Sequence, residues 1–482
     1  MCSIIVADGN SSLDEVYEML DKLTHRGPDA FGVYYNGNVY YNRPLYDFDN
    51  SENKTNDEVI LAHNLLSIVG DNVVQPLFSS QLTLVANAEI YNSDELIEKY
   101  NLFTDSDCEV MLKVIEHYYN GDLKEAVLNT LEELDGDYAF CIYDHKDYMI
   151  VRDRMGVKPV YYSTESDKFI SASEKKAFKS SSNVSSLNPR WAIYNGQLMK
   201  ISDEYKRCEE FGDIDEFKHN LKDALIKAVD KRSKNLDKVA LLFSAGVDST
   251  LIAVILKELD VDFTAYTIGT SNSQDLEFAK KTADDMQIPL KYNVISKEDV
   301  EYYLEPTLNA IEDNNLMKLG VGMAIKMASK LASLDDNKVI LSGQGADELF
   351  AGYNRYKNKI NSPQELLDEL SHDLNSMYHV NLERDDKAVM SNSMELRVPF
   401  LDRNVVDLAS KIPLKYLIDS PEDNLRKHIL RDVAYELGVS RDIAYRPKKA
   451  AQYGTGIDKI IRKKLLKEEK YQKLLSSTIS HK

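Results

Sequence analysis

The chain of 482 residues is poor in glycine and in cysteine. Its 20 glycines make up about 4% of the residues against a usual ~7%, so any place where glycines gather is informative. The four cysteines are too few and too scattered for a disulfide scaffold, and no Cys/His cluster has the spacing of a zinc site. These absences exclude a small disulfide-rich fold and favour a reducing compartment.

Long hydrophobic runs are also missing. Residues 239–256 come nearest to a run of about 18 apolar residues, but polar side chains interrupt them. Residues 1–8 lack the basic region of a targeting segment, and their apolar run is too short. We therefore expect a cytoplasmic protein that does not span a membrane.

The charge balance is acidic, with 59 Lys and Arg against 79 Asp and Glu, a net of −20. A surface of this sign repels polyanions, which disfavours nucleic acid and anionic membranes as partners. Residues 446–482 depart from it, with eleven basic residues against three acidic ones. A solvated helical face is the ordinary explanation of such a run. The alternative is that some of these lysines face a phosphate.

The first two hundred residues combine short β-like runs with helical periodicity, which is an α+β pattern. The expected strands are 3–7, 32–41, 59–61, 82–86, 138–143, 148–152 and 160–163, and the expected helices 13–23, 94–100, 107–119 and 123–134.

Beyond a charged stretch at 202–215, strands and longer helices alternate. The expected strands are 239–243, 263–268, 290–294 and 338–341, and the expected helices include 217–231 and 250–259. This alternation predicts a parallel sheet that binds ligands at the carboxyl ends of its strands. We place the domains at 1–207 and 208–482.

A turn of small residues follows the first of these strands and opens a helix. Unpaired backbone N–H groups at a helix N-terminus attract phosphate, and Gly246 lets the backbone approach closely. Hydroxyl donors stand at Ser244, Ser249 and Thr250. Asp248 would repel a phosphate unless it holds Mg²⁺. An ordinary serine N-cap is the alternative reading.

A second turn, at 341–353, makes that alternative less attractive. It again follows a strand, and it places three glycines within ten residues of a glycine-poor chain. It also carries an acid, Asp347. Two strand-end turns, each with an Asp, predict that Asp248 and Asp347 chelate one metal-bound pyrophosphate.

Over nearly its whole length the sequence resembles the glutamine-dependent asparagine synthetases. The shared motifs are Met1-Cys2, residues 25–29 (His-Arg-Gly-Pro-Asp), 86–92 (Ala-Asn-Ala-Glu-Ile-Tyr-Asn), 106–109 (Ser-Asp-Cys-Glu), both turns, and 393–402 (Ser-Met-Glu-Leu-Arg-Val-Pro-Phe-Leu-Asp). The resemblance implies an α+β Ntn-hydrolase domain, an αββα sandwich, followed by an α/β PP-loop ATP pyrophosphatase domain.

The resemblance also implies the chemistry of the second domain. ATP would be split between its α and β phosphates to activate a carboxylate as an acyl-adenylate, with Mg²⁺ on Asp248 and Asp347. Lys448 matches the lysine that stabilises the adenylation transition state. The implied ATP-binding residues are Ser244, Gly246, Asp248, Ser249, Thr250, Ile268, Ser342, Gly343 and Gly345.

Cys2 follows the initiator Met, and removal of that Met would leave a free α-amine beside the thiol. An amine with a pKa near 7.7 to 8.0 can serve as the general base for the thiol. An inert terminal cysteine is the alternative for an isolated Met-Cys. By the resemblance, Cys2 attacks the glutamine carboxamide, and Asn87 and the backbone N–H of Ala88 form the oxyanion hole. Glu89 and Asp107 match the acids that hold the glutamine α-ammonium.

Several positions depart from the family. Leu65 stands where the family has an arginine for the glutamine α-carboxylate, and Arg26 is a candidate replacement. Gln344 replaces a glutamate that serves proton transfer, and an amide cannot act as a base. Glycine is usual at two positions that carry Ala88 and Ala245. Where the family has a substrate-binding Thr-Thr-x-Arg run, this chain aligns Met317, Lys318 and Gly320.

The leading hypothesis is an ATP-dependent, glutamine-hydrolysing asparagine synthetase, in which ammonia crosses an internal channel to adenylated aspartate. Its expected partners are glutamine, ATP and aspartate, and a homodimer is left open. One alternative is another acceptor carboxylate, or a tRNA base, which would need the basic residues 446–482. A catalytically degenerate binding protein is the third alternative. Retention of Cys2, Asn87, Asp107, Asp248, Asp347 and Lys448 argues against it.

Overall fold

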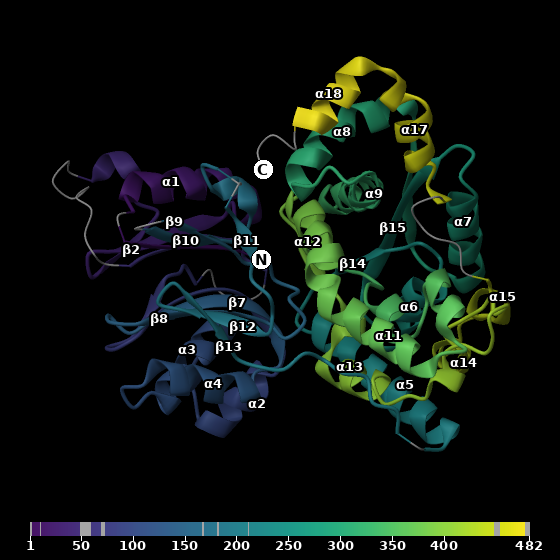
Figure 1. Ribbon diagram of the computed structural model, residues 1–482, viewed down its shortest axis with the longest axis horizontal. Coiled ribbons are helices and arrows are strands. Elements are labelled where there is room, and N and C mark those ends of the chain that lie inside the picture. The colour runs from purple at the N-terminus through teal and green to yellow at the C-terminus, as the bar shows by residue number, and fades with distance from the viewer. Residues whose placement is uncertain are drawn as a thin grey trace. The chain divides into compact units, whose positions relative to one another are not determined.

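The computed structural model describes residues 2–9, 11–48, 59–68, 73–165, 168–180, 183–210, 212–447 and 454–477 (Figure 1). The chain divides into two compact units. The first contains the residues up to Asp203 together with Tyr378–Ser393 and Ser477–Lys482, and the second contains Glu204–Met377 and Met394–Ser476. A short stretch from the second half of the sequence is therefore part of the first unit.

Two antiparallel sheets form the centre of the first unit. One has the order β11-β9-β10-β1-β4-β2-β3 and the other the order β13-β12-β8-β7-β6-β5. The first sheet consists of β1 (Ser3–Gly9), β2 (Ala30–Tyr35), β3 (Asn38–Tyr41), β4 (Ile60–Leu65), β9 (Tyr161–Glu165), β10 (Lys168–Ala172) and β11 (Ser185–Ser186). The second consists of β5 (Leu77–Phe78), β6 (Thr83–Ile90), β7 (Gly136–Tyr143), β8 (Tyr148–Arg152), β12 (Trp191–Tyr194) and β13 (Gln197–Lys200).

Alternating side chains divide the core of this unit into layers. Ile4 and Val6 of β1 pack with Val85 of β6 between the sheets, whereas Ile5 and Ala7 point to the opposite face. That face is covered by α1 (Leu13–Lys22), and the outer face of the second sheet by α2 (Ser93–Tyr100), α3 (Asp107–Tyr118) and α4 (Leu123–Glu133), as Figure 1 shows. The expected αββα sandwich is thus confirmed.

One predicted strand, 32–41, is a hairpin instead. β2 and β3 pair around Asn36 and Gly37, whose φ angles are 50° and 73°. An Asn-Gly pair favours this two-residue turn because both residues tolerate a positive φ. Asn36-Gly37 was therefore the sequence signal for the turn. It was overlooked because the residues on both sides of it have a β-like pattern.

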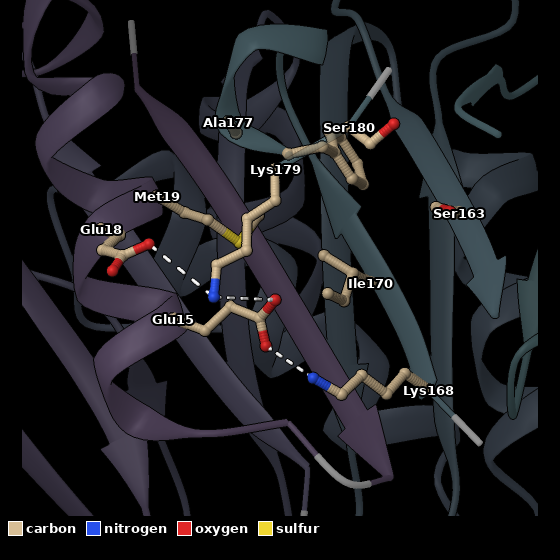
Figure 2. Close-up of a pocket in the computed structure, with 10 residues that line it drawn as sticks. Glu15, Glu18, Met19, Ser163, Lys168, Ile170, Ala177, Lys179 and Ser180 are labelled. Atoms are coloured by element: carbon tan, nitrogen blue, oxygen red, sulfur yellow. Dashed lines mark hydrogen bonds and ion pairs between the residues drawn. The ribbon is translucent and has the colours of Figure 1, made fainter. Parts of the chain in front are cut away.

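A pocket of about 200 Å³ lies beside α1 (Figure 2). Its charged side chains pair with one another: Lys168 lies 3.0 Å from Glu15, and Lys179 lies 4.0 Å from Glu15 and 3.9 Å from Glu18. Mutual pairing of this kind is typical of a solvated surface. We assign this pocket no function.

The second unit contains a parallel sheet with the order β16-β15-β14-β17-β18. Its strands are β14 (Val239–Leu242), β15 (Phe263–Thr270), β16 (Leu290–Ile295), β17 (Val339–Leu341) and β18 (Glu395–Arg397). The helices between them are α6 (Val247–Glu258), α7 (Gln274–Met286), α8 (Lys297–Ile311) and α9 (Leu316–Ser333), after an initial α5 (Ile214–Ser233). The predicted parallel sheet is confirmed, but three-residue β18 was too short to show a pattern. Among the described residues, no helix is long and apolar enough to cross a membrane.

Candidate active sites

Cys2 directly precedes β1 in the first unit and is buried, with 8% of its surface exposed. Its backbone is held on two sides. The Cys2 N–H donates to Asn87 Oδ1 at 3.0 Å, and the Cys2 carbonyl accepts from Arg26 Nε at 3.1 Å. The predicted nucleophile and two of its predicted partners are therefore brought together.

Asn87 lies in the middle of β6 and is fully buried. Its Oδ1 accepts from Cys2, but its Nδ2 is buried and finds no hydrogen-bond partner among the described residues. Leaving such a donor unsatisfied costs about 1–3 kcal/mol. A buried donor beside a thiol suits an oxygen that arrives with the substrate, which is what an oxyanion hole requires.

The two predicted acids lie on neighbouring elements. Glu89 is half-buried on β6, and Asp107 begins α3 behind its N-cap, Ser106. Asp107 accepts from the N–H of Ile90 at 2.9 Å, so it joins the end of β6 to α3. Burial raises the pKa of the Cys108 thiol well above its ordinary value, and the charges of Asp107, Cys2 and Glu89 add to the effect. The charges of both acids and of Cys2 are therefore felt at Cys108.

Arg26 is fully buried, and its guanidinium serves several partners at once. Besides the Cys2 carbonyl, Nη1 lies 2.7 Å from Glu174 Oε1 and 2.8 Å from Asp386 Oδ2. Burial lowers the Arg26 pKa, but the charges of Asp386 and Glu174 outweigh it and raise that pKa. Leu65, at the end of β4, is buried with 8% exposed.

Sequence reasoning missed Glu174 and Asp386. Asp386 is 360 positions from Arg26 along the chain, so no motif could join them. Glu174 was also overlooked as an acid that carries no motif. Both acids stand in charged stretches of the sequence, at 174–176 and 383–387, so neither was distinguished from an ordinary surface residue.

In the second unit, the two predicted loops meet. They follow β14 and β17, which are adjacent parallel strands. A Cβ added to Gly343 would lie 3.0 Å from the Asp248 Cβ, so the loops are in contact and this position requires a small residue. The Ser342 N–H donates to the Arg397 carbonyl of β18 at 3.0 Å, which fixes the second loop.

Lys427 holds the two predicted carboxylates together. Its Nζ lies 2.8 Å from both oxygens of Asp248 and 2.5 Å from Asp347 Oδ1, and its side chain is 1% exposed. Burial lowers the Lys427 pKa, but the charges of Asp248 and Asp347 overcome this and raise the pKa. The lysine is therefore charged. Sequence reasoning missed it because Lys427 lies 179 residues from Asp248 and belongs to no local motif.

The donor set of this site fits a divalent cation. Asp248 lies in the first turn of α6 and Asp347 in the first turn of α10 (Ala346–Leu349). Their side chains are 22% and 23% exposed, so they offer carboxylate oxygens to a ligand. Mg²⁺ prefers such oxygens together with substrate phosphates. The Lys427 ammonium shows that the site stabilises positive charge between the two carboxylates.

The other predicted ATP-binding residues differ in their exposure to solvent. Ser244 is exposed, and its Oγ lies 3.3 Å from Ser249 Oγ. Thr250 is fully buried in α6, so its hydroxyl is not brought to the loop surface, and Ile268 is buried in β15. Ala245 has a φ of 53°, a left-handed conformation that costs an alanine about 1–2 kcal/mol.

The remaining predicted positions carry less information. Lys448 lies outside the described residues. Gln344 is half-buried in the second loop. Met317, Lys318 and Gly320 lie in the first turns of α9, where Lys318 Nζ pairs with Asp313 at 2.9 Å.

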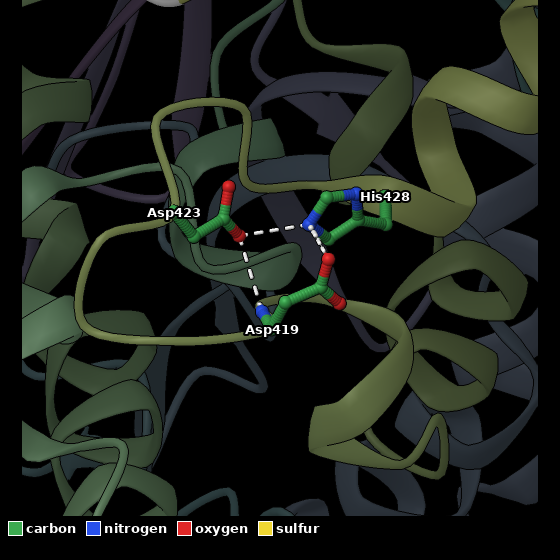
Figure 3. A group of neighbouring side chains, drawn as sticks. All are labelled: Asp419, Asp423 and His428. Atoms are coloured by element: carbon green, nitrogen blue, oxygen red, sulfur yellow. Dashed lines mark hydrogen bonds and ion pairs between the residues drawn. The ribbon is translucent and has the colours of Figure 1, made fainter.

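The side chains of Asp419, Asp423 and His428 stabilise a turn next to Lys427 (Figure 3). His428 Nε2 lies 2.8 Å from Asp423 Oδ2 and 3.2 Å from Asp419 Oδ2. Asp423 Oδ1 also accepts from the N–H groups of Leu425 and Arg426, at 2.8 and 3.0 Å. The group therefore fixes the turn that gives Lys427 its positive φ.

Two protein-family models match this chain. A family model described as a glutamine amidotransferase domain matches residues 48–217, and one described as asparagine synthase matches 220–370 and 357–481. The chain belongs to the asparagine synthase family. The PP-loop assignment of the second unit follows from this membership.

Three curated relatives span most of the chain. A Methanocaldococcus jannaschii protein, which carries the provisional name asparagine synthetase [glutamine-hydrolyzing] 1, is 39% identical over 96% of this chain and 95% of its own. Asparagine synthetase B [glutamine-hydrolyzing] of Escherichia coli is 29% identical over 95% of this chain and 83% of its own. Human asparagine synthetase [glutamine-hydrolyzing] is 27% identical over 90% of this chain and 80% of its own.

Proposed function

We propose that this chain is an ATP-dependent, glutamine-hydrolysing asparagine synthetase. It would convert aspartate, glutamine and ATP to asparagine, glutamate, AMP and pyrophosphate. The observation that carries the proposal is the unsatisfied Asn87 Nδ2 beside Cys2, because this donor suits glutamine hydrolysis. The Asp248–Lys427–Asp347 group supports the ATP half. We assign glutamine hydrolysis to the first unit and the ATP reaction to the second. These units differ from the domains expected from sequence, 1–207 and 208–482, because the first unit includes Tyr378–Ser393.

Glutamine hydrolysis needs a nucleophile, a base and an oxyanion hole. With Met1 removed, the α-amine of Cys2 takes the thiol proton and the sulfur attacks the carboxamide carbon. Asn87 Nδ2 and the Ala88 N–H donate to the oxyanion. Ammonia leaves, and water then cleaves the γ-glutamyl thioester to glutamate. Glu89 and Asp107 hold the substrate α-ammonium.

In this chain Leu65 stands where the family has the arginine that pairs with the α-carboxylate of glutamine. Arg26 was the candidate replacement, and direct contact with glutamine stays a prediction. Its guanidinium contacts the Cys2 carbonyl, Glu174 and Asp386. We therefore propose that Arg26 supports the site at least through Cys2.

In the second unit, the aspartate β-carboxylate would attack the ATP α-phosphorus and release pyrophosphate. Asp248 and Asp347 would hold Mg²⁺, which neutralises phosphate charge when it is bound. Lys427 and Lys448 add positive charge for the phosphates. Ammonia then attacks the acyl carbon of β-aspartyl-AMP and AMP leaves. Because Gln344 cannot accept the ammonia proton, another group must do so.

The decisive experiment separates the two half-reactions with Cys2→Ala. This variant should lose glutamine-dependent asparagine formation and retain ammonia-dependent formation. Cys208→Ala removes an exposed thiol of the second unit and should retain both activities. Equal loss of both activities in Cys2→Ala would contradict separate sites.

The acceptor is tested by pyrophosphate release from ATP with a panel of acids. Aspartate should stimulate release more than other small carboxylates. Steeply salt-dependent binding of tRNA, with tRNA-stimulated release, would instead favour the nucleic-acid alternative. Failure of every candidate would favour a binding protein without catalysis.

A further inference from the structure

The helix α12 (Glu383–Met390) lies in the second half of the sequence but belongs to the first unit. All eight of its residues are buried, including three acids, one arginine and one lysine. Burying so many charges is costly unless each of them is paired. We therefore expect the charged side chains of this helix to have partners.

Glu383 is anchored to the scaffold of the first unit. Its Oε1 lies 3.3 Å from Arg152 Nη1, and its Oε2 accepts a hydrogen bond from the hydroxyl of Tyr161, at the start of β9. Arg152 ends β8. The helix is therefore attached to both sheets at its N-terminal end.

Asp386 has a different partner. Its Oδ2 lies 2.8 Å from Arg26 Nη1, and the Nε of the same guanidinium donates to the Cys2 carbonyl at 3.1 Å. Asp386 and Cys2 are thus joined through the guanidinium of Arg26. Because this group is rigid and planar, a carboxylate that fixes its orientation also fixes the direction of its other hydrogen bonds.

The other carboxylate at Arg26 is shared with more groups. Glu174 lies 3.2 Å from His25 Nε2 and 2.7 Å from Lys176 Nζ, as well as 2.7 Å from Arg26. Glu174 is therefore shared among three basic side chains, whereas Asp386 contacts Arg26. This contact comes at a cost, because the Oδ1 of Asp386 is buried with no hydrogen-bond partner among the described residues. A buried carboxylate with one oxygen unpaired does not add much to the stability of the fold, so the stability of the fold does not explain why Asp386 is there.

We propose that Asp386 is a positioning residue for glutamine hydrolysis: it orients Arg26, and Arg26 holds the Cys2 carbonyl so that the thiol faces the carboxamide. The inference rests on glutamine hydrolysis at Cys2, which is the proposed function. It assigns part of the first active site to a helix encoded within the second half of the chain. Small displacements of a nucleophile are expensive, since about 1 Å can cost about 100-fold in rate.

The neighbouring residue provides a matched control. Asp385 is buried to nearly the same extent as Asp386, with 2% and 1% exposed. It pairs with Arg384 on its own helix at 2.7 Å. Asp385→Asn thus removes an equally buried carboxylate from the adjacent position while leaving the Arg26 contact in place.

The experiment compares full-length wild type, Asp386→Asn and Asp385→Asn by glutamine hydrolysis and by ammonia-dependent pyrophosphate release. For Asp386→Asn we expect the kcat of glutamine hydrolysis to fall about 10- to 100-fold, with the KM within about twofold. Ammonia-dependent release should stay within about twofold, and Asp385→Asn should resemble wild type in both assays. Asp386→Glu, which keeps the carboxylate, should recover part of the lost kcat.

Four results would overturn the inference. They are an unchanged kcat in Asp386→Asn, a rise in KM alone, an equal loss of ammonia-dependent release, and an equal loss of kcat in Asp385→Asn. A rise in KM alone would mean that Arg26 binds glutamine directly. If wild type itself does not hydrolyse glutamine, the proposed function fails. If wild type hydrolyses glutamine and Asp386→Asn matches it, only the positioning role fails.

Discussion

The ammonium nitrogen of Lys427 lies 2.8 Å from each carboxylate oxygen of Asp248, in a position that is almost completely buried. Asp347 contributes a third oxygen from a separate loop. Two carboxylates from neighbouring strand ends would repel each other in a buried site without a cation between them. Lys427 therefore keeps the two loops together in the form of the protein described here.

Lys427→Met is expected to disable the ATP half alone. Loss of the ammonium leaves Asp248 and Asp347 without their shared partner and removes positive charge from the phosphate site. We expect ammonia-dependent pyrophosphate release to fall about 100-fold or more. Glutamine hydrolysis should remain, and the surface variant Lys415→Met should keep both activities. An intact release rate in Lys427→Met would show that Lys427 has no part in the ATP reaction.

The contrast between Asp248 and Lys427 shows which parts of this site are predictable from sequence. Asp248 stands in a strand-turn-helix segment, so local chemistry alone placed it at an anion site. Lys427 reaches the same point from a turn held by Asp423 and His428, across 179 residues of chain. Contacts of that separation arise from packing, which periodicity and turn signals do not encode.

The fold shows the same division. The layers were predictable because alternating strands such as β1 have one face on each side of the sheet, and period 2 is visible in sequence. Membership of α12 in the first unit was not, because a buried helix that carries five charged residues has no apolar face to recognise. The roles of its charges depend on partners elsewhere in that unit.

Gly352→Ala tests the packing behind the carboxylates. A Cβ at this position would lie 2.0 Å from Asp347 Oδ1 and 2.3 Å from Lys427 Cε, so the pair would have to move. We expect ammonia-dependent pyrophosphate release to fall about 10-fold or more. Glutamine hydrolysis serves as the internal control and should not change. Wild-type release in this variant would mean that the Asp347–Lys427 pair tolerates displacement.

Asn87→Ala tests the oxyanion hole. The variant removes the buried Nδ2 and also the acceptor of the Cys2 N–H. Loss of one oxyanion donor lowers kcat by about 100- to 1,000-fold in other acyl-transfer sites, and we expect a similar loss of glutamine hydrolysis. The check is steady-state hydrolysis, with ammonia-dependent synthesis as the control. A change in KM without a change in kcat would assign Asn87 to substrate binding instead.

His63 predicts how the stability of the first unit depends on pH. It is fully buried on β4, its Nε2 lies 3.1 Å from the Ala86 carbonyl, and burial lowers its pKa from 6.5 to about 3. His63 therefore takes up a proton near pH 6.5 in the unfolded chain, but only near pH 3 in the folded chain. The stabilisation is complete above pH 6.5 and is lost as the pH falls toward 3, by about 1.4 kcal/mol per pH unit.

Urea unfolding measures this loss. It can be followed by the fluorescence of Trp191, which is the single tryptophan and lies on β12. Between pH 7.5 and pH 5, the free energy of unfolding of wild type should fall by about 2 kcal/mol more than that of His63→Gln. Equal losses in the two proteins would mean that His63 is protonated in the folded state.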